Sequence, residues 1–479
     1  MDTKKLRQKI LDLAIRGKLV PQDPNDEPAS VLLERIKAEK ERLIKEGNNK
    51  RSKKSAKTSD TPHYENVPFE VPSSWVWTNI EELFFVTKLA GFEYTDYLTK
   101  DAISSNNEIP IVRAQNVRMG HFVENTNEAI SEALSQLLER SALTKECLLM
   151  TFIGAGIGDT CIFPALKRCH LAPNVAKIEP YSGKIDLRYA LYYLMSDLGQ
   201  LGVRGISKST AQPSLSMATI RSLDVALPPL AEQRRIVTEI EKWFSLIDQI
   251  EQGKADLQTT IKQTKSKILD LAIHGKLVPQ DPNDEPAMEL LKRINPDFAP
   301  CDNGHYPNGW QQTILGELFY HNTGKALNSS NKEGVMRNYL TTSNVYWNKF
   351  DFTVIKQMPF KESELDKCTV TKGDLLVCEG GDIGRSAIWN YDYDICIQNH
   401  IHRLRPKIDL CVLFYYYALA YLKENNLIGG KGIGLLGLSS NALHKIELPL
   451  PPLTEQQRIV QKIEELFSVL DNIQKALEV

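Results

Sequence analysis

The most regular pattern along the chain is an alternation of apolar positions that predicts long amphipathic helices. Between residues 236 and 271, eleven positions are separated by alternating steps of four and three residues, and nine of them are apolar. Steps of this size place side chains in one stripe along a helix, as in a coiled coil. The predicted stripe contains Ile236, Ile240, Trp243, Ile247, Ile250, Leu257, Ile261, Ile268 and Leu271, with Lys254 and Thr264 as its polar members.

The same stripe recurs at both ends of the chain. Near the C-terminus it consists of Ile459, Ile463, Leu466, Leu470, Ile473 and Leu477, and near the N-terminus it consists of Leu6, Ile10 and Leu13. A helix with polar flanks and one apolar stripe is unstable alone in water. We therefore expect the central helix to pack antiparallel against the C-terminal helix. The N-terminal helix would complete a second copy of this pair, and the two chain ends would lie near each other.

Glycine and proline residues predict where these helices end. Gly17 and Gly275 follow the apolar pattern as C-terminal caps, and the proline residues that come after each of them forbid continuation. A further helix is predicted over 30–46. Residues 48–61 carry five basic side chains against one acidic, which is typical of a flexible linker; the basic charge could also contact phosphate.

Long internal repeats organise the chain. The segment KILDLAIRGKLVPQDPNDEPA at 9–29 recurs at 267–287 with a single difference, Arg16 against His274. A second pair, 227–250 and 450–473, is identical at 15 of 24 positions, and both members begin with the pattern LPPL-x-EQ. The chain therefore contains two copies of one plan.

The segments between the repeats are much less similar, yet their landmarks share one register. Each has a tryptophan near its start, short β-branched runs, an Asn-Val pair, a Leu-Leu pair before a glycine loop, and a late aromatic helix. The predicted fold is α/β (α+β). Two similar α/β domains are separated by long antiparallel, coiled-coil-like helices, in a circular repeat with a pseudo-two-fold axis. The expected boundaries are 1–61, 62–228, 229–300, 301–449 and 450–479.

Composition narrows the class of protein. The 479 residues carry 58 Lys and Arg against 60 Asp and Glu, so the net charge of −2 gives no sign of nucleic-acid binding, and any such role needs local basic surfaces. The longest apolar run, 410–422, is shorter than the ~20 residues of a membrane span. The first ten residues do not resemble a signal peptide, so we expect a cytoplasmic protein.

Two groups of residues contain side chains that could bind a metal ion or a phosphate. The eight cysteines form no C-x-x-C pair. Cys161, Cys169 and His170 could ligate zinc, but a fourth ligand at suitable spacing is missing, and no metal is expected. The histidines in HIHRLRPK at 400–407 alternate along a predicted strand as face or core residues, or form a phosphate-facing patch with Arg403 and Arg405.

The glycine-rich segments do not complete a cofactor motif. The segment FIGAGIGDT at 152–160 resembles the loop with which methyltransferases hold S-adenosylmethionine, but no following helix or ribose-binding acid is evident. A glycine-bearing turn, CEGGDIGRS at 378–386, stands at the matching point of the second half, which indicates a shared structural turn. The segment 202–210 resembles a phosphate loop, but Ser207 replaces the required glycine.

No catalytic motif was found. The Pro-Pro pairs at 228–229 and 451–452 are flanked by leucine, so they cannot hold a target amine as an amino-methyltransferase loop does. Nucleophile-elbow, zinc-protease and nuclease patterns are missing as well. A helix over 231–273 would span roughly 60 Å, which corresponds to about 18 base pairs of DNA. Two diverged modules at its ends would suit two unrelated half-sites at a fixed gap.

These features together resemble one known family. Two divergent inserts, each ending in LPPL-x-EQ-x-RIV before a long helix, and the KILDLAI repeat are similar to the specificity subunit of type I DNA restriction and modification systems. The resemblance covers nearly the whole chain. It implies that the inserts are target-recognition domains on double-stranded DNA and that the helices dock two modification (N6-adenine methyltransferase) subunits, which restriction subunits join. It also implies that S-adenosylmethionine, ATP and magnesium belong to those partners and that this chain holds no cofactor.

Candidate DNA contacts are polar residues in predicted loops, because amide, hydroxyl and basic groups can hydrogen-bond base edges. Asn116 and Asn344 occur in both inserts, so they could instead fix a turn, and their differing neighbours are the better candidates for differing specificity. The candidates are Arg113, Gln115, Asn116, Lys208, Ser209 and Gln212 in the first insert, and Thr341, Thr342, Ser343, Asn344 and Lys431 in the second.

Two functions other than that of a specificity subunit would explain part of these features. A non-catalytic adaptor with two protein-binding modules on a coiled coil explains the helices equally well, but it does not explain the LPPL boundaries. A fused methylase and specificity enzyme would need a further catalytic domain, and the duplicated plan already occupies the 479 residues.

Overall fold

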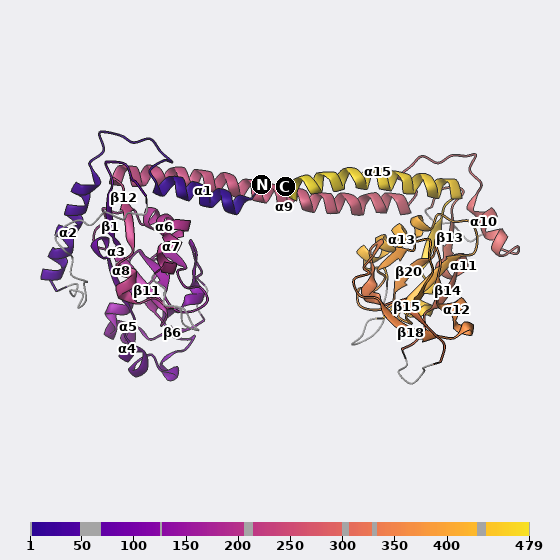
Figure 1. Ribbon diagram of the computed structural model, residues 1–479, viewed down its shortest axis with the longest axis horizontal. Helices are drawn as coiled ribbons and strands as arrows, with labels where there is room; N and C mark the ends of the chain where they lie inside the picture. The colour runs from indigo at the N-terminus through magenta and orange to yellow at the C-terminus, as the bar shows by residue number, and fades with distance from the viewer. Residues whose placement is uncertain are drawn as a thin grey trace. The chain divides into compact units, whose positions relative to one another are not determined.

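The structure is a computed structural model that describes residues 2–47, 69–124, 127–205, 214–298, 306–327, 333–428 and 437–478. The chain divides into two compact units, here called the first unit (Asp2–Gln252) and the second unit (Gly253–Val479). Each consists of helices and a mixed α/β module. Both units are drawn in Figure 1.

In the first unit, the N-terminal helix runs antiparallel to the long central helix. Helix α1 (Thr3–Ile15) lies along α9 (Leu230–Ile273), as Figure 1 shows. Arg7 donates to Asp248 at 2.6 Å, and Asp26, which follows α1 in the chain, accepts from Arg235 at 2.6 Å. Later residues of the N-terminal segment therefore contact earlier residues of α9, as expected for an antiparallel arrangement. Helix α2 (Ala29–Lys45) follows and buries Leu32, Leu33 and Ile36 against the module.

The first module is built on three small sheets. Strand β1 (Val76–Asn79) pairs antiparallel with β12 (Asp224–Leu227). An antiparallel sheet has the order β2 (Phe84–Lys88), β11 (Val175–Pro180), β8 (Cys147–Thr151), β9 (Thr160–Phe163). The other has the order β6 (Ala129–Ile130), β3 (Ile109–Val112), β10 (Cys169–Leu171), β7 (Ala142–Leu143), in which β3 and β10 are parallel.

Short elements and helices complete the first module. A small hairpin is formed by β4 (Val117–Arg118) and β5 (His121–Phe122). Helix α6 buries Tyr189, Leu191 and Tyr193 in the core shared with α1 and α9. The helical elements are α3 (Ile80–Leu83), α4 (Gly91–Asp96), η1 (Lys100–Ala102), η2 (Ala114–Asn116), α5 (Glu132–Leu137), η3 (Glu139–Ser141), α6 (Leu187–Met195), α7 (Asp197–Gly205) and α8 (Met217–Arg221).

The second module repeats this plan strand for strand. Its sheets are β13–β24, then β14–β23–β20–β21, then β18–β15–β22–β19 with β15 and β22 parallel, and the hairpin β16–β17. The bounds are β13 (Gln311–Ile314), β14 (Phe319–Thr323), β15 (Val335–Leu340), β16 (Val345–Tyr346), β17 (Lys349–Phe350), β18 (Lys356–Phe360), β19 (Thr369–Val370), β20 (Leu375–Cys378), β21 (Ser386–Ile388), β22 (Ile395–Ile397), β23 (Ile401–Pro406) and β24 (Glu447–Leu450). The predicted pair of similar α/β modules is confirmed.

The helices of the second unit also match those of the first. Helix α15 runs antiparallel to the later part of α9, because Leu477 O accepts from Lys254 at 2.9 Å while Asp471 pairs with Lys265. The bounds are α10 (Ala287–Ile294), α11 (Leu315–Leu318), η4 (Thr342–Asn344), α12 (Glu362–Cys368), α13 (Val412–Glu424), α14 (Ser440–His444) and α15 (Leu453–Glu478). No helix in the described ranges is long and apolar enough to cross a membrane.

The predicted apolar stripe is only partly buried. Buried members are Ile236, Ile240, Ile247, Ile261, Ile268, Ile459, Ile463 and, on α1, Ile10, whereas Leu6, Leu13, Leu271, Leu466, Leu470 and Leu477 are half-buried. Four other members of the stripe, Trp243, Ile250, Leu257 and Ile473, are 39–40% exposed.

The modules themselves explain this difference in the first unit. The ring of Phe244 lies 5.8 Å from that of Tyr192 on α6, and the Arg7 guanidinium lies 5.1 Å above Phe244. Helices α1 and α6 therefore occupy the side of α9 that carries Phe244, and this turns Trp243 and Ile250 toward solvent. The sequence pattern predicts that α9 packs against other helices of the spacer, whereas the structure shows that α9 also packs against helix α6 of the module.

Candidate functional site

A buried carboxylate joins the first module to α9. Glu232, in the first turn of α9, accepts from the indole Nε1 of Trp75 at 2.9 Å and from Gln22 Nε2 at 2.5 Å. Burial raises the pKa of the Glu232 carboxyl, and the hydrogen bonds from Trp75 and Gln22 oppose that shift. One side chain thus ties together the repeat after α1, the start of the module and the start of the long helix.

The second unit contains the same junction. Glu455 accepts from Trp310 Nε1 at 2.9 Å and from Gln280 Nε2 at 2.7 Å, and Arg458 forms a bidentate pair with Asp284 as Arg235 does with Asp26. The neighbouring glutamines match too. Gln233 and Gln456 each donate at 2.9 Å to the carbonyl of the first proline in LPPL.

These contacts give the repeated sequences a structural role. The glutamate and glutamine of LPPL-x-EQ fasten the module to the helix, and Gln22 and Gln280 of the PQDPNDEPA segments complete the junction. The near-identical repeats form the same buried network in both copies. The positions that differ most between the two copies therefore lie in the modules and not in these junctions.

The first group of predicted contact residues lies just after β3. The side chain of Asn116 is buried, with Oδ1 accepting from the Arg113 backbone N–H at 2.9 Å and Nδ2 donating to Val123 O at 2.9 Å. Arg113 is half-buried and pairs with Glu128, whereas Gln115 is exposed. Asn116 therefore fixes the turn, and Gln115 is the side chain of this group that faces solvent.

The equivalent group after β15 has the same geometry. The buried Asn344 accepts from the Thr341 N–H and hydroxyl at 2.8 Å each, and it donates to Asp351 O at 2.8 Å and Val354 O at 2.9 Å. Thr341 is buried, Thr342 is half-buried and Ser343 is exposed. The remaining candidates, Lys208, Ser209, Gln212 and Lys431, lie outside the described residues.

The two glycine-rich segments are turns between antiparallel strands. Residues 152–160 connect β8 to β9, and 378–386 connect β20 to β21. A dinucleotide or S-adenosylmethionine loop instead leads from a strand into a helix. The interpretation of both segments as a shared structural turn is therefore favoured by the geometry.

Sequence reasoning missed a pair of side chains beside each glycine turn. In the first module, Arg118 at the end of β4 opposes the burial that raises the pKa of Asp159, the residue before β9. In the second module, the position equivalent to Asp159 is Arg385, and the position equivalent to Arg118 is Tyr346. The Arg385 guanidinium lies 4.9 Å from the centre of the Tyr346 ring. No motif could identify these pairs, because the strand pairing brings them together.

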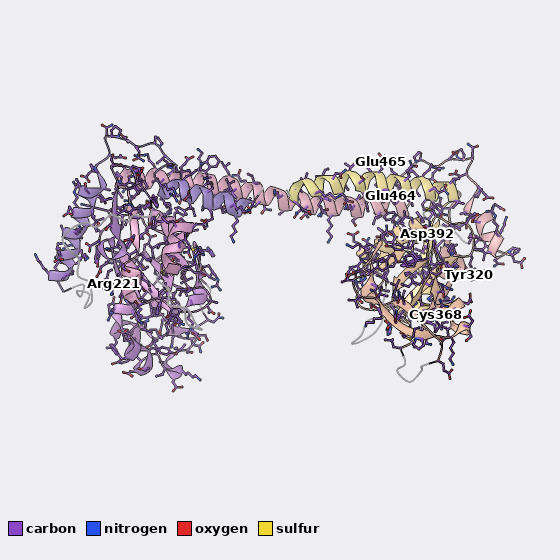
Figure 2. All side chains as sticks on the ribbon, viewed as in Figure 1. Arg221, Tyr320, Cys368, Asp392, Glu464 and Glu465 are labelled. Carbon is purple, nitrogen blue, oxygen red and sulfur yellow. The ribbon has the colours of Figure 1, made fainter. Side chains whose placement is uncertain are left out.

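The histidine and arginine residues of β23 are engaged inside the second module. His402 accepts at Nδ1 from His321 Nε2 at 2.9 Å, Arg403 donates to Asp366 O at 2.8 Å, and Arg405 donates to Asp374 at 2.7 and 2.8 Å. Of the two readings of this strand, the structure favours face and core residues over a phosphate patch. Tyr320, on the paired strand β14, stands exposed nearby with the Lys407 ammonium 5.6 Å from its ring (Figure 2).

Metal ligation finds no support in the described parts of the chain. Both ring nitrogens of His170 face backbone carbonyls, those of Leu171 at 3.1 Å and Leu138 at 3.2 Å. Burial raises the pKa of the Cys161 and Cys169 thiols, to about 12 and about 11. Across the described ranges, no group of three or more His, Cys, Asp or Glu side chains is placed to hold a metal ion.

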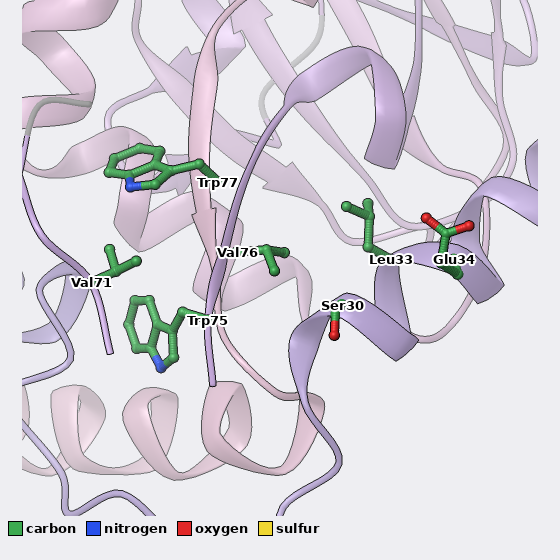
Figure 3. Close-up of a pocket in the computed structure, with 7 residues that line it drawn as sticks. All are labelled: Ser30, Leu33, Glu34, Val71, Trp75, Val76 and Trp77. Carbon is green, nitrogen blue, oxygen red and sulfur yellow. The ribbon is translucent and has the colours of Figure 1, made fainter. Parts of the chain in front are cut away.

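A cavity of about 350 Å³ lies between α2 and β1 in the first unit (Figure 3). Its lining is mostly apolar, and Trp75 is already bonded to Glu232. A ligand site normally adds several convergent polar groups to an apolar lining, and here few are present. The lining residues are Ser30, Leu33, Glu34, Val71, Trp75, Val76 and Trp77.

Relatives of this chain align with it over nearly its whole length. It is 27% identical over 561 aligned positions to the type I restriction enzyme EcoAI specificity subunit of Escherichia coli, covering 98% of this chain and 90% of that protein. It is 25% identical over 579 positions to the EcoEI specificity subunit of Escherichia coli, covering 99% and 91%.

Solved structures share the fold. A chain from a structure described as the basis of complex assembly and conformational transition of the type I R-M system has a TM-score of 0.56 at 16% identity, covering 86% of this chain and 94% of that one. The HsdS subunit from Thermoanaerobacter tengcongensis has a TM-score of 0.53 at 18% identity, covering 85% and 93%.

The family model for the type I restriction modification DNA specificity domain matches residues 72–259 and 307–479. These ranges contain both modules, both LPPL-x-EQ junctions and most of α9 and α15. The match covers about three quarters of the chain, and it falls twice, as the duplicated topology requires. The chain belongs to the family of type I restriction–modification DNA specificity subunits, the non-catalytic components that recognise the DNA target.

Proposed function

We propose that this chain selects a bipartite, asymmetric DNA target, with each module reading one half-site. The observation that carries this proposal is the contrast between equivalent positions. The modules share strand order and junctions, yet side chains at equivalent positions differ, as at the exposed Gln115 against Ser343 and the half-buried Asp159 against Arg385. Two modules that share a fold but carry different side chains at equivalent positions are suited to bind two half-sites of unrelated sequence on one DNA duplex.

The central helix offers a physical basis for a fixed gap between the half-sites. Helix α9 is continuous over 44 residues, which at ~1.5 Å per residue is about 66 Å. Inserting or deleting one helical turn between Ile250 and Ile268 is expected to change the gap and leave both half-site sequences unchanged. A variant that changed a half-site sequence at constant gap would contradict this role.

We infer that two modification (N6-adenine methyltransferase) subunits dock on the helices. Each unit exposes an equivalent apolar pair there: Leu246 and Ile250 on α9 are 41% and 40% exposed, and Val469 and Ile473 on α15 are 55% and 40% exposed. On α15, Glu464 and Glu465 lie earlier on the same helix (Figure 2). Two like surfaces favour two copies of one partner, and exposed apolar groups of this kind mark interaction sites.

The docking proposal is testable by stoichiometry. Leu246→Asp with Ile250→Asp is expected to reduce the bound modification subunits from two to one, because burying a carboxylate in an apolar contact is unfavourable. Native mass spectrometry of the purified complex measures the count. The matched variant Val469→Asp with Ile473→Asp is expected to give the same loss, and two bound subunits in both variants would contradict the proposal.

The remaining chemistry is assigned to partners. Restriction subunits join the modification core, and S-adenosylmethionine, ATP and magnesium bind to those subunits. The specificity subunit needs no cofactor of its own to recognise DNA. The complex then acts on DNA in the cytoplasm of a prokaryotic cell.

Sequencing that detects modified bases tests the whole proposal. Genomic DNA is compared between cells that express this chain with its modification subunit and cells that lack this chain. Loss of N6-methyladenine from one split, asymmetric motif is the expected result. If every methylated motif survives, the target-selection proposal fails, and a role as a protein-binding adaptor becomes the better explanation.

A further inference from the structure

A two-stranded ribbon in the second module is exposed in a way that its sequence did not indicate. Strand β15 pairs with β18 over five residue pairs, from Val335–Phe360 to Tyr339–Lys356. The first four residues of β15 are all exposed, with Val335 and Met336 at 63% and 57%, and so are Lys356 and Gln357 at the start of β18. Figure 1 shows this ribbon at the end of the module away from α15.

The equivalent strands of the first module are buried. In β3 and β6, the residues Ile109, Pro110, Ala129 and Ile130 are all buried, and Ser104 bridges the outer edge of β6 at Ala129. Twenty residues connect β2 to β3 there and supply α4 and η1, whose neighbours Leu89 and Leu98 join Ile109 and Ile130 in one cluster. Only eleven residues connect β14 to β15, so the second module has less chain to cover its ribbon.

The side chains on one face of this ribbon are suited to base edges. Asn338 and Gln357 are directly opposed, and Gln357 Nε2 donates to Asn338 Oδ1 at 2.9 Å. This bond holds the two amides side by side, and among the described residues the Asn338 amino group and the Gln357 carbonyl bond to nothing else, so they offer a donor and an acceptor. Whichever amide donates to the other, the pair still offers both functions. Met336 lies on the same face, next along the strand.

An adenine presents the matching pattern in the major groove. Its N7 accepts and its N6 amino group donates, and asparagine and glutamine are the side chains that pair with both. The 5-methyl group of the paired thymine offers an apolar contact of the kind Met336 can make. A ribbon of five pairs is about 16 Å long, and the major groove, ~12 Å wide, admits a two-stranded ribbon.

We propose that the β15–β18 ribbon enters the major groove and that Asn338 and Gln357 together read one A·T base pair of the second module's half-site. This inference rests on the proposed function, namely that each module reads one half-site. Arg337 and Lys356, both exposed beside the amide pair, supply positive charge toward the flanking phosphates. The first module has no counterpart to this amide pair, since Pro110 and Ala129 occupy the equivalent positions.

The test uses the full chain in complex with its modification subunit. Asn338→Ala and Gln357→Ala are each expected to relax one A·T position of one half-site in the methylated motif, while the other half-site and the gap stay unchanged. Lys372→Ala is the matched control, because Lys372 is exposed in the same module outside the ribbon and pairs with Asp392 (Figure 2); it is expected to keep the motif.

A binding measurement keeps the proposal testable if a variant methylates poorly. Replacing the relevant adenine by 7-deazaadenine removes only the N7 acceptor. We expect about 5-fold to 150-fold weaker binding by the wild-type complex, the cost of leaving the amide donor that faces N7 without an acceptor in the contact. The complex that carries both Asn338→Ala and Gln357→Ala, checked by its thermal midpoint for correct folding, is expected to bind both DNAs equally, because neither amide remains to donate to N7.

The outcomes separate this inference from the proposed function. Variants that fold normally and retain the strict motif would overturn the ribbon assignment, as would equal 7-deazaadenine sensitivity in wild type and variant. A loss of bound modification subunit without a change of motif would instead make the ribbon a protein contact and also overturn the assignment. If the wild-type complex produces no split motif, the proposed function itself fails.

Discussion

The two modules have one topology and two surfaces. Every strand of the first has a counterpart in the second, and the junctions at Glu232 and Glu455 have the same partners at nearly the same distances. The modules differ at the ribbon and at the residues beside the glycine turns. The two modules thus differ in sequence where side chains face solvent, and they agree where side chains belong to a buried hydrogen-bond network.

The two modules also differ at a group of side chains in their interiors. In the second module, His321 on β14, His402 on β23 and His444 on α14 form a cluster with ring centroids 4.6 and 4.8 Å apart. In the first module the equivalent positions hold Val86, Ala176 and Arg221, and Arg221 (Figure 2) donates to Val86 O at 2.8 Å. The same positions of the shared fold can therefore be filled either by a cluster of histidine side chains or by a combination of apolar side chains and an arginine.

The largest expected effect comes from the junctions. Trp310→Ala is expected to lower the free energy of unfolding of the second unit by about 3–5 kcal/mol, because it leaves a cavity and removes a hydrogen bond to the buried Glu455. Trp75→Ala is expected to do the same in the first unit. Denaturant unfolding followed by hydrogen exchange measures each unit, and a loss that reached both units equally from one substitution would contradict the separate junctions.

The helix caps are expected to have the next largest effect. Gly17 and Gly275 have φ near +65°, and an added Cβ would lie 2.8 Å from Pro72 Cδ and 2.9 Å from Pro307 Cδ. Gly17→Ala and Gly275→Ala are each expected to cost about 2–3 kcal/mol from backbone strain and ring contact. Gly47→Ala is the matched control. Gly47 has φ +75°, and no atom of the described residues lies within 4 Å of an added Cβ, so a loss of about 1–2 kcal/mol is expected. Equal losses at all three positions would remove the role of the prolines.

The histidine cluster predicts a difference in acid sensitivity. Burial lowers the pKa of His321 to about 4, with the like charges of His402 and His444 adding to the shift, and burial lowers the pKa of His402 too. Because an unfolded histidine titrates near 6.5, the unfolded chain binds more protons below that pH. The stability that the neutral cluster contributes is therefore present above pH 6.5 and lost as the pH falls toward 4.

Thermal midpoints and hydrogen exchange between pH 7.5 and 4.5 measure this effect. The second unit is expected to lose protection earlier than the first. In the first unit His170 is a buried histidine with a lowered pKa, and no ring among the described residues contacts it. Glu379 favours the charged form of His402, whereas His400 and His444 oppose it. His321→Val, the residue type of Val86, is expected to flatten the pH dependence, and an unchanged profile would exclude the cluster as its cause.

The smallest expected effect on stability is at the exposed turn residues. Gln115→Ala and Ser343→Ala are expected to change the free energy of unfolding by less than about 0.5 kcal/mol, since both side chains face solvent. Each is expected to alter the base preference of one half-site only. Methylation-motif sequencing and thermal melting measure the two quantities together. A change in both half-sites from one substitution would contradict the assignment of one module to each.

Particular residues show how far the sequence could lead. The near-identical repeats and the Asn-Val landmarks correctly predicted two modules of one fold, and the presence of Asn116 and Asn344 in both copies pointed to the turn that the structure contains. Trp243 and Ile250 of the predicted stripe are each 40% exposed, because heptad spacing identifies an apolar stripe but does not say which neighbour covers each of its members.

What the sequence determined by itself is the duplicated plan, the α/β class and the family, since repeats, periodicity and junction motifs are local in the chain. Only the tertiary structure decided which side chains are available. Arg403 and Arg405 are bound inside the second module, whereas Asn338 and Gln357, nineteen residues apart, meet on an exposed ribbon. The physical reason is that exposure depends on strand pairing and on which segments cover a sheet, and these contacts join positions that no local pattern relates.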